Sequence, residues 1–231
     1  TSEGTFKAKT VVIATGASPR ELGIEGEKEL VGRGVNYCAA CDGMFYKDKT
    51  VVVVGGGNSA AADALLLSRI CKKVILVHRR DELRATKIYH QSLMQAENVE
   101  FQWNQTVESV LESIVADDGH DGRQGRRFSG GRNHVQITGV RLKNAATGEK
   151  QEIVCDGIFV SVGREPETRM IENQVVLDEN GYIIADESTK TNLRGVFAVG
   201  DIRTKALRQI VTATADGANA AYAVEEYLAN K

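Results

Sequence analysis

TVVVVGGGNSA, residues 50–60, is the stretch that decides the fold of this chain. A run of strand-favouring residues ends in a glycine turn, and residues 60–70 then place small and apolar side chains at the spacing of a buried helix face. Glycine turns are common, so the pattern Gly55-x-Gly57-x-x-Ala60 is informative only because a strand precedes it and a helix follows it. The stretch therefore predicts the strand-turn-helix unit of a parallel α/β domain that binds a dinucleotide.

The small residues of this turn have separate expected roles. Gly55 would allow the tight turn, Gly57 would let the backbone approach a pyrophosphate, and Ala60 would let the helix pack closely on the strand. The pyrophosphate would be held at the helix N-terminus, where we expect Asn58 and Ser59 to belong to the same cofactor site.

A group of basic residues follows the next apolar stretch, at about the distance where a dinucleotide site contacts the ribose. An NAD site would place Asp or Glu there, whereas this chain has His78, Arg79 and Arg80, followed by Arg84. Guanidinium groups suit a 2′-phosphate, so the sequence predicts NADPH as the nucleotide. A solvated basic turn is the alternative for any one of these arginines, but it is a weaker explanation for the group.

A dithiol motif, CAACDG at residues 38–43, precedes the glycine turn. The two-residue spacer keeps the sulfurs of Cys38 and Cys41 within bonding reach, which is typical of a redox-active pair, and Asp42 supplies a neighbouring acid. A zinc site is the alternative, but zinc needs four ligands. The remaining candidates are isolated in the sequence: Cys71, Cys155, His78, His90, His120 and His134. We therefore expect no metal, and packing roles for the two other cysteines.

The composition sets broad limits on function. The chain has 231 residues, 42% of them hydrophobic and 26% charged, and a net charge of −2, which is typical of a soluble globular protein without a preference for nucleic acid or anionic membranes. No apolar run has the length of a membrane span or a signal segment, and four cysteines with one close pair do not make a secreted disulfide framework. These features predict a cytoplasmic protein.

Four motifs together resemble the low-molecular-weight, bacterial-type thioredoxin reductases: GRGV at 32–35, CAACDG at 38–43, GGGNSA at 55–60 and HRRDELR at 78–84. The resemblance covers nearly the whole chain and implies a Rossmann-like α/β flavoprotein with two dinucleotide-binding domains. It implies FAD-binding segments at 1–23 and 159–231, and an inserted NADPH-binding domain at 24–158. Members of the family carry an N-terminal flavin-binding βαβ unit that this sequence lacks, so we expect an incomplete FAD domain. A homodimer is expected from the family.

The segment GVFAVGD at 195–201 resembles the second flavin fingerprint of such enzymes. The resemblance implies that Gly200 and Asp201 lie at the flavin, with Asp201 receiving a ribityl hydroxyl. It also implies that Arg208, Gln209 and the Ile210 backbone approach the isoalloxazine, at the start of a final helix that reaches about residue 228. A helix cap is the alternative role for Asp201, because Asp favours such positions.

The implied reaction passes electrons from NADPH through FAD to the Cys38–Cys41 disulfide, and then to thioredoxin or a thioredoxin-like protein. In the family the cysteine matching Cys41 faces the flavin and the one matching Cys38 attacks the substrate, which leaves Asp42 to protonate the departing thiolate. Rotation of the inserted domain would need hinges, expected near 22–26 and 155–159. Two alternatives stay open: the flavoprotein of an alkyl hydroperoxide reductase, and a non-catalytic NADP-binding module.

The remaining elements are expected outside these motifs. A helix is predicted at 84–97, a hairpin turn at Asn180-Gly181, and a β-hairpin arm from strands at 107–115 and 135–143. The tip of that arm, 117–133, is rich in Gly, Asp and Arg, and we interpret it as a solvated tip, with a partner-docking arm as the alternative.

Overall fold

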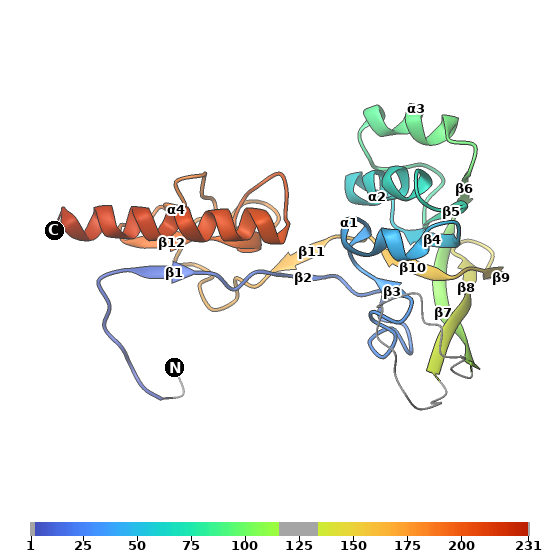
Figure 1. Ribbon diagram of the computed structural model, residues 1–231, viewed down its shortest axis with the longest axis horizontal. Coiled ribbons are helices and arrows are strands. Elements are labelled where there is room, and N and C mark those ends of the chain that lie inside the picture. Colours follow the sequence, from blue (N-terminus) through green and yellow to red (C-terminus); the bar gives the residue numbers. More distant parts are fainter. Residues whose placement is uncertain (1–2, 116–133, 231) are drawn as a thin grey trace. The chain divides into compact units, whose positions relative to one another are not determined.

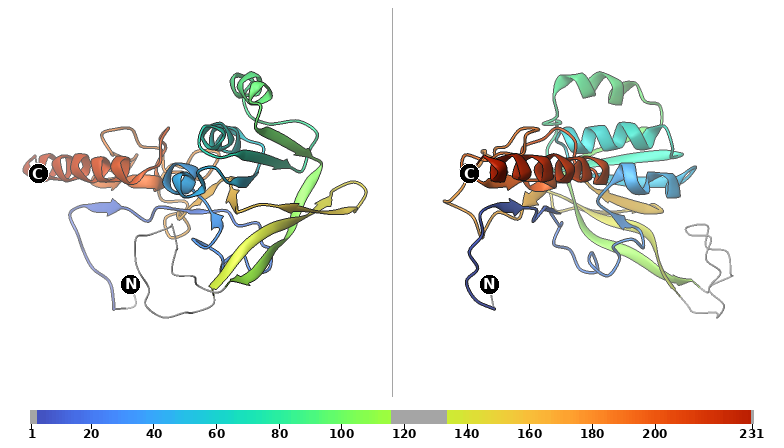
Figure 2. Two further views of the ribbon diagram at one scale, coloured as in Figure 1. Left: turned by 45° about the vertical axis from the view of Figure 1, so that its right-hand side comes forward. Right: turned by 60° about the vertical axis from the view of Figure 1, so that its left-hand side comes forward.

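A computed structural model of the chain describes residues 3–115 and 134–230. The chain forms two compact units (Figures 1 and 2): Thr1–Pro19 with Arg164–Lys231, called the first unit, and Arg20–Gly163, called the second unit. The range predicted for the inserted domain, 24–158, falls inside the second unit. The predicted tip at 117–133 lies outside the described residues.

A five-stranded parallel sheet forms the centre of the second unit (Figure 1). Its strands, in spatial order, are β3 (Val35–Asn36), β10 (Gly157–Val160), β4 (Thr50–Val54), β5 (Lys73–His78) and β6 (Val99–Trp103). Helix α2 (Asn58–Ser68) connects β4 to β5, and α3 (Lys87–Gln95) connects β5 to β6. Parallel strands are covered on both faces, which explains why β4 is a run of valines rather than an alternation of apolar and polar residues.

Alternate side chains of these strands enter two different cores. Val51 and Val53 of β4 pack with the buried alanines of α2, whereas Val52 and Val54 face the other way. Their partners on that side come from an antiparallel sheet of β7 (Gln105–Val115), β8 (His134–Asn144) and β9 (Lys150–Val154) (Figure 2). The predicted pairing of the hairpin arm is confirmed, with Val107 opposite Leu142.

Two helices of the second unit begin at residues other than the predicted ones. The helix expected at 60–70 begins at Asn58, one residue after the glycine turn. The helix expected at 84–97 begins only at Lys87. The N–H groups of Arg84 and Ala85 donate to the Gly56 carbonyl at 2.7 and 3.0 Å, so these two residues are held against the glycine turn instead of joining the helix.

The first unit is built on two short strand pairs and one long helix. Strand β1 (Val11–Ile13) pairs in parallel with β12 (Val196–Ala198), and α4 (Ile210–Ala229) packs near them; Ile13, Ile183 and Ile202 belong to their core. The final helix is confirmed, with Gln209 at its N-cap. The Asn180-Gly181 turn is also confirmed, since Leu177 and Ile183 on its two sides form an antiparallel bridge.

A two-stranded antiparallel ribbon lies where the chain leaves and re-enters the first unit. Strands β2 (Ala17–Pro19) and β11 (Arg164–Pro166) pair there, and the Arg20 N–H donates to the Gly163 carbonyl at 3.0 Å just beyond them. The segments expected as hinges lie farther inside the second unit: the Leu22 N–H donates to the buried Glu27 carboxylate, and 157–159 belong to β10. The chain therefore passes between the units at the ribbon and not at those segments.

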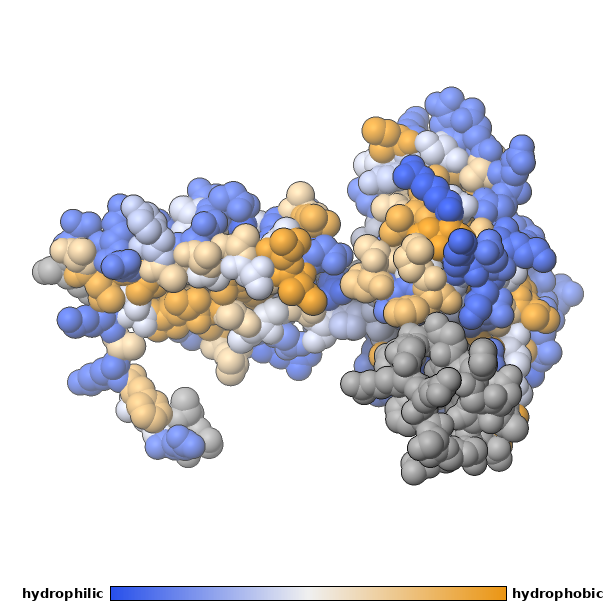
Figure 3. Space-filling view, viewed as in Figure 1, coloured by the Kyte–Doolittle hydropathy of each residue, from blue (hydrophilic) through white to orange (hydrophobic). Residues whose placement is uncertain are grey.

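Exposed apolar side chains are concentrated on parts of the first unit. Ile210, Val211 and Tyr222 of α4 are each more than two thirds exposed, and Figure 3 shows apolar surface along this helix. In the described part of the chain, no helix combines the length and apolar character needed to cross a membrane.

Candidate functional site

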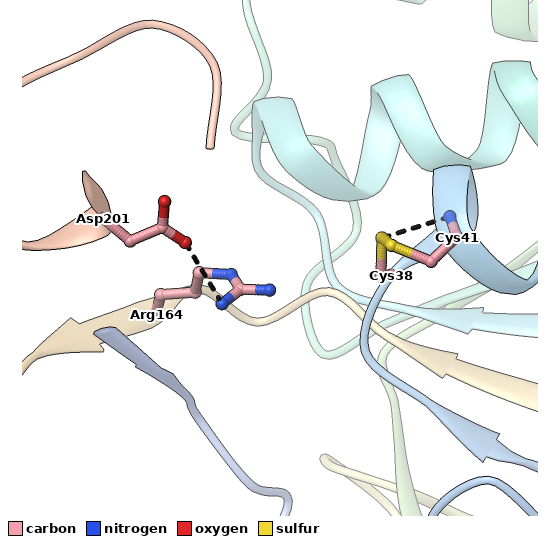
Figure 4. The surroundings of a disulfide bond; sticks show 4 residues. All are labelled: Cys38, Cys41, Arg164 and Asp201. Carbon is pink, nitrogen blue, oxygen red and sulfur yellow. Dashed lines mark hydrogen bonds and ion pairs between the residues drawn. A yellow bond between two sulfur atoms is a disulfide. The ribbon is translucent and has the colours of Figure 1, made fainter. Parts of the chain in front are cut away.

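The dithiol motif forms a disulfide at the start of a short helix. Cys38 is the N-cap of α1 (Ala39–Asp42) and is bonded to Cys41, with a Cα–Cα separation of 5.3 Å (Figure 4). The Cys38 sulfur also accepts the Cys41 N–H at 3.2 Å. Cys41 is exposed and Cys38 is half-buried, so the motif lies at the surface of its unit.

A buried amide fixes the strand before the disulfide to the turn after it. The Asn36 side chain in β3 donates to the Gly34 and Ile158 carbonyls and, at 2.9 Å, to the hydroxyl of Tyr46 in the 3-10 helix η1 (Gly43–Tyr46). The Tyr46 ring packs edge-on against Phe159, with 5.2 Å between ring centroids. The disulfide is therefore held on a rigid support at the edge of the sheet.

Asp42 follows the second cysteine and is half-buried. Burial raises the pKa of its carboxyl above the usual aspartate range. A raised pKa keeps the carboxyl protonated over a wider pH range, which suits a group that gives a proton to a leaving thiolate.

The glycine turn has the backbone that its sequence requires. Gly55 has φ +147°, and a Cβ there would collide with the Ser161 carbonyl and the Ala60 methyl group. Gly57 is the N-cap of α2, and a Cβ on it would meet nothing within 4 Å. The first N–H groups of a helix have no partner within it, so the open space beside Gly57 is suited to a phosphate.

Hydrogen bonds bring the loop that follows β5 to this turn; this loop, residues 79–86, is called the arginine loop. In addition to the two N–H groups accepted by the Gly56 carbonyl, the Asn58 side chain accepts the Thr86 N–H at 2.8 Å. Arg84 is thereby placed directly beside the glycine turn. The Asn58 side chain therefore helps to hold the arginine loop against the glycine turn. The sequence did not predict this contact.

Arg79, Arg80 and Arg84 are exposed, and among the described residues no carboxylate is within ion-pair distance of them. His78, in contrast, is buried, and its ring packs directly against Gly56, so that a Cβ added to Gly56 would collide with the imidazole. Burial, and then the neighbouring arginines, lower the pKa of His78, which favours the neutral imidazole. Within the described ranges, three cations without an ion-pair partner thus belong to the loop that is bonded to the glycine turn, and the His78 ring packs against that turn.

Gly55→Ala is expected to destabilise the second unit by about 1–3 kcal/mol, because the methyl group meets backbone at a φ that side chains rarely adopt. Gly57→Ser is the matched control: its side chain has open space and serine is a good N-cap, so the free energy of unfolding should change by no more than about 0.5 kcal/mol. Urea unfolding of both variants checks this, and equal losses would contradict it.

The predicted flavin residues lie together in the first unit, on the loop between β12 and α4. Asp201 belongs to the 3-10 helix η2 (Gly200–Ile202), and its Oδ1 is buried with no hydrogen-bond partner among the described residues. Its Oδ2 is 3.9 Å from Nη1 of Arg164 (Figure 4). The alternative role as a helix cap is wrong for Asp201, because Gln209 caps α4.

The residues before α4 are also partly positioned for a ligand. The Arg208 guanidinium stacks on the Tyr182 ring at 3.9 Å and its Nε is buried without a partner in the described chain. Gln209 forms a capping box with Thr212, and Ile210 is 84% exposed at the first turn of α4. Among the described residues, one acceptor atom of Asp201 and one donor atom of Arg208, both on one loop, lack a partner, and a hydroxylated, heterocyclic cofactor would supply partners for them.

The zinc alternative receives no support from the residues that the structure describes. Both sulfurs of the dithiol motif are bonded to each other. Within residues 3–115 and 134–230, no three His, Cys, Asp or Glu side chains are grouped closely enough to hold a metal ion. Cys71 and Cys155 are buried, and burial raises the pKa of their thiols, to about 11 and about 12.

The family described as pyridine nucleotide-disulphide oxidoreductase matches residues 1–217. The chain belongs to this family. Among its relatives, the thioredoxin reductase of Peptoclostridium litorale is 43% identical over 98% of the chain, and that of Listeria monocytogenes is 43% identical over 97%. The crystal structure of thioredoxin reductase from Streptococcus pyogenes aligns with a TM-score of 0.80 at 40% identity over 96% of the chain.

The chain is shorter than the proteins it matches. It covers 67% of the Peptoclostridium protein, 64% of the Listeria protein and 66% of the Streptococcus structure, about two thirds in each case. The predicted fold class, a Rossmann-like flavoprotein fold with two dinucleotide-binding domains, is confirmed by this family membership and by the structural match.

Two groups of interacting residues in this oxidoreductase were not found from the sequence. Ser161 donates to Asp63 of α2 beside the glycine turn, at 2.5 Å and across 98 positions of sequence. Asp216 of α4 pairs with Arg203 and Lys205 in the loop that carries Asp201. The available signal was weak in both cases: an acidic residue flanked by small residues within a helix.

Proposed function

We propose that the protein is an NADPH-dependent thioredoxin-disulfide reductase that uses FAD. The observation that carries the proposal is that one unit contains both the Cys38–Cys41 disulfide and a glycine turn to which the loop of exposed arginines is hydrogen-bonded. The first feature is a redox group and the second is a site for a phosphorylated dinucleotide. The names of the relatives point to the same substrate.

NADPH would be bound by the N-terminus of α2. Gly57 leaves space for the pyrophosphate beside the first-turn amides of Asn58 and Ser59, while Gly55 permits the tight turn and Ala60 the close packing of the helix. The 2′-phosphate would pair with the guanidinium groups of the loop after β5, which are those of Arg79, Arg80 and Arg84. The His78 ring would support the turn by packing against Gly56.

FAD would be held in the first unit by the loop after β12. Asp201 Oδ1 would accept a ribityl hydroxyl, and Arg208, Gln209 and the Ile210 backbone would contact the ring system, with Gly200 giving the turn its shape. When bound, FAD supplies two-electron transfer between the nicotinamide and the disulfide.

The reduced dithiol would then reduce a disulfide on the partner by exchange. The Cys38 thiolate attacks one partner sulfur, the partner S–S bond breaks, and the leaving thiolate takes a proton from Asp42. The Cys41 thiolate attacks the Cys38 sulfur of the mixed disulfide, which releases the second partner thiolate and restores the Cys38–Cys41 bond. One disulfide is thus reduced as the other is formed.

The proposal also covers the partner, the oligomeric state and the compartment of the enzyme. Thioredoxin or a thioredoxin-like protein is the partner, the enzyme is a homodimer, and it acts in the cytoplasm.

The test is NADPH oxidation by the purified protein with FAD, started by adding oxidised thioredoxin. Oxidation of NADPH with one new thioredoxin dithiol per NADPH is the expected result. Binding of NADPH without electron transfer would instead favour a non-catalytic NADP-binding module. Electron transfer to a peroxide-reducing partner but not to thioredoxin would favour an alkyl hydroperoxide reductase flavoprotein.

Arg79→Gln/Arg80→Gln is expected to weaken NADPH binding by about 10- to 100-fold, because hydrogen bonds to a charged group contribute about 1.5–3 kcal/mol. NADH has no 2′-phosphate, so its dissociation constant should change by no more than about threefold. Titration of both nucleotides checks the prediction. Lys87→Gln, an exposed charge on α3, is the control, and equal weakening of NADH and NADPH would contradict a contact to the 2′-phosphate.

A further inference from the structure

A buried ionic cluster lies behind the loop that carries Asp201. Asp216 comes from α4, and Arg203 and Lys205 come from the loop, with side chains that are only 2%, 1% and 5% exposed. Arg203 donates to both Asp216 oxygens, Nε at 2.8 Å and Nη2 at 2.6 Å, and the Lys205 ammonium donates at 2.8 Å. One carboxylate therefore accepts hydrogen bonds from two buried cations.

The same carboxylate reaches the backbone beside Asp201. The Gly200 N–H donates to Asp216 Oδ2 at 2.8 Å, so Asp216 contacts the loop at its start as well as at Arg203 and Lys205. Arg203 also donates hydrogen bonds to the Ala185 and Thr204 carbonyls and to the carboxylate of Glu187, whose side chain is 82% exposed. A single side chain of α4 thus contacts the loop at three residues: Gly200, Arg203 and Lys205.

The partners of this carboxylate stabilise its charged form. Burial alone would raise the pKa of Asp216, but hydrogen bonds from Arg203, Lys205 and the Gly200 N–H outweigh burial and lower it to about 2. The cluster is therefore ionised in the native protein.

Stability alone does not account for such a cluster, because apolar residues of similar volume are often as stabilising as a buried ion pair. Its distinctive property is geometric precision, since charged hydrogen bonds restrict the loop to one conformation. That conformation leaves Asp201 Oδ1 and Arg208 Nε buried and unpaired among the described residues. Holding unpaired polar atoms in place is useful only if a ligand pairs with them.

We propose that Asp216 is a positioning residue for FAD, which fixes the Gly200–Arg208 loop so that Asp201 and Arg208 are presented to the cofactor before it binds. The inference rests on the proposed use of FAD. Asp216 itself stays behind the loop and acts through Gly200, Arg203 and Lys205.

The test is a titration of the apo-protein with FAD, followed by the quenching of flavin fluorescence, at a temperature well below the melting temperature of each variant. Asp216→Asn keeps the shape but removes the charge, and it should weaken FAD binding by about 10- to 100-fold, as the loss of a supporting residue behind a binding group typically does. Glu187→Gln removes an exposed partner of Arg203 without touching Gly200, and should change the dissociation constant by no more than about threefold.

Lys205→Met provides a second measurement that keeps the Arg203–Asp216 pair, and it should weaken FAD binding by roughly 3- to 10-fold. A folded Asp216→Asn protein with unchanged FAD affinity would overturn the inference. If Asp216→Asn does not fold, unchanged affinity in Lys205→Met overturns it. Failure of the unaltered protein to bind FAD would instead refute the proposed function, and with it the inference.

Discussion

Cys41→Ser is expected to lower the NADPH-driven reduction of thioredoxin by more than about 10³-fold, because residues that react as a unit lose nearly all activity when one is removed. The disulfide with Cys38 cannot form, so the exchange sequence has no oxidised form to reduce and no thiolate to resolve a mixed disulfide. NADPH binding should be unchanged, since the glycine turn and the arginine loop do not contact Cys41 through any of their described hydrogen bonds.

The matched control for this variant is Cys71→Ala. Cys71 is buried and unpaired by any disulfide, so its removal should leave turnover within about threefold of the original rate. The measurement is the steady-state rate of NADPH oxidation with oxidised thioredoxin, alongside the dissociation constant of NADPH. Retention of thioredoxin reduction by Cys41→Ser would exclude the Cys38–Cys41 disulfide from the electron path.

Asp216→Leu is expected to destabilise the first unit by about 3–5 kcal/mol, because Arg203 and Lys205 would be left buried without their carboxylate. Urea unfolding, read by hydrogen exchange at the amides of α4, measures the loss in this unit. The effect is large compared with the total stability of a typical domain, and most of it is the penalty for uncompensated charge.

A triple replacement separates that penalty from simple loss of packing. Arg203→Met/Lys205→Met/Asp216→Leu removes all three buried charges together, and its stability should return to within about 1 kcal/mol of the original protein. A triple variant as unstable as Asp216→Leu would mean that packing, not unpaired charge, causes the loss.

Local sequence patterns predicted the parts of this protein that depend on neighbouring residues. The valines of β4 indicate a strand buried on both faces, and Gly55 is required by a backbone angle that follows from the turn itself. The spacing of Cys38 and Cys41 predicted their pairing for the same reason. These features are encoded within a few residues of each other.

The unpredicted features depend on contacts between distant segments. The helix expected from Arg84 begins at Lys87, because the N–H of Arg84 is taken by the Gly56 carbonyl. Asp216 is flanked by small residues in α4, and nothing local reveals that two cations of the preceding loop pair with it. Side chains that complete a site from another element are visible only in three dimensions.

The ribbon of β2 and β11 has a consequence for how the protein acquires its structure. Because Arg20 and Gly163 are hydrogen-bonded to each other, the second unit is one continuous segment whose two ends meet. We expect it to fold on its own. Once folded, it would join the separated parts of the first unit by a short link, which reduces the entropy lost on closing that long loop. The second unit is therefore expected to form earlier during synthesis, and it could be moved between related proteins as a cassette.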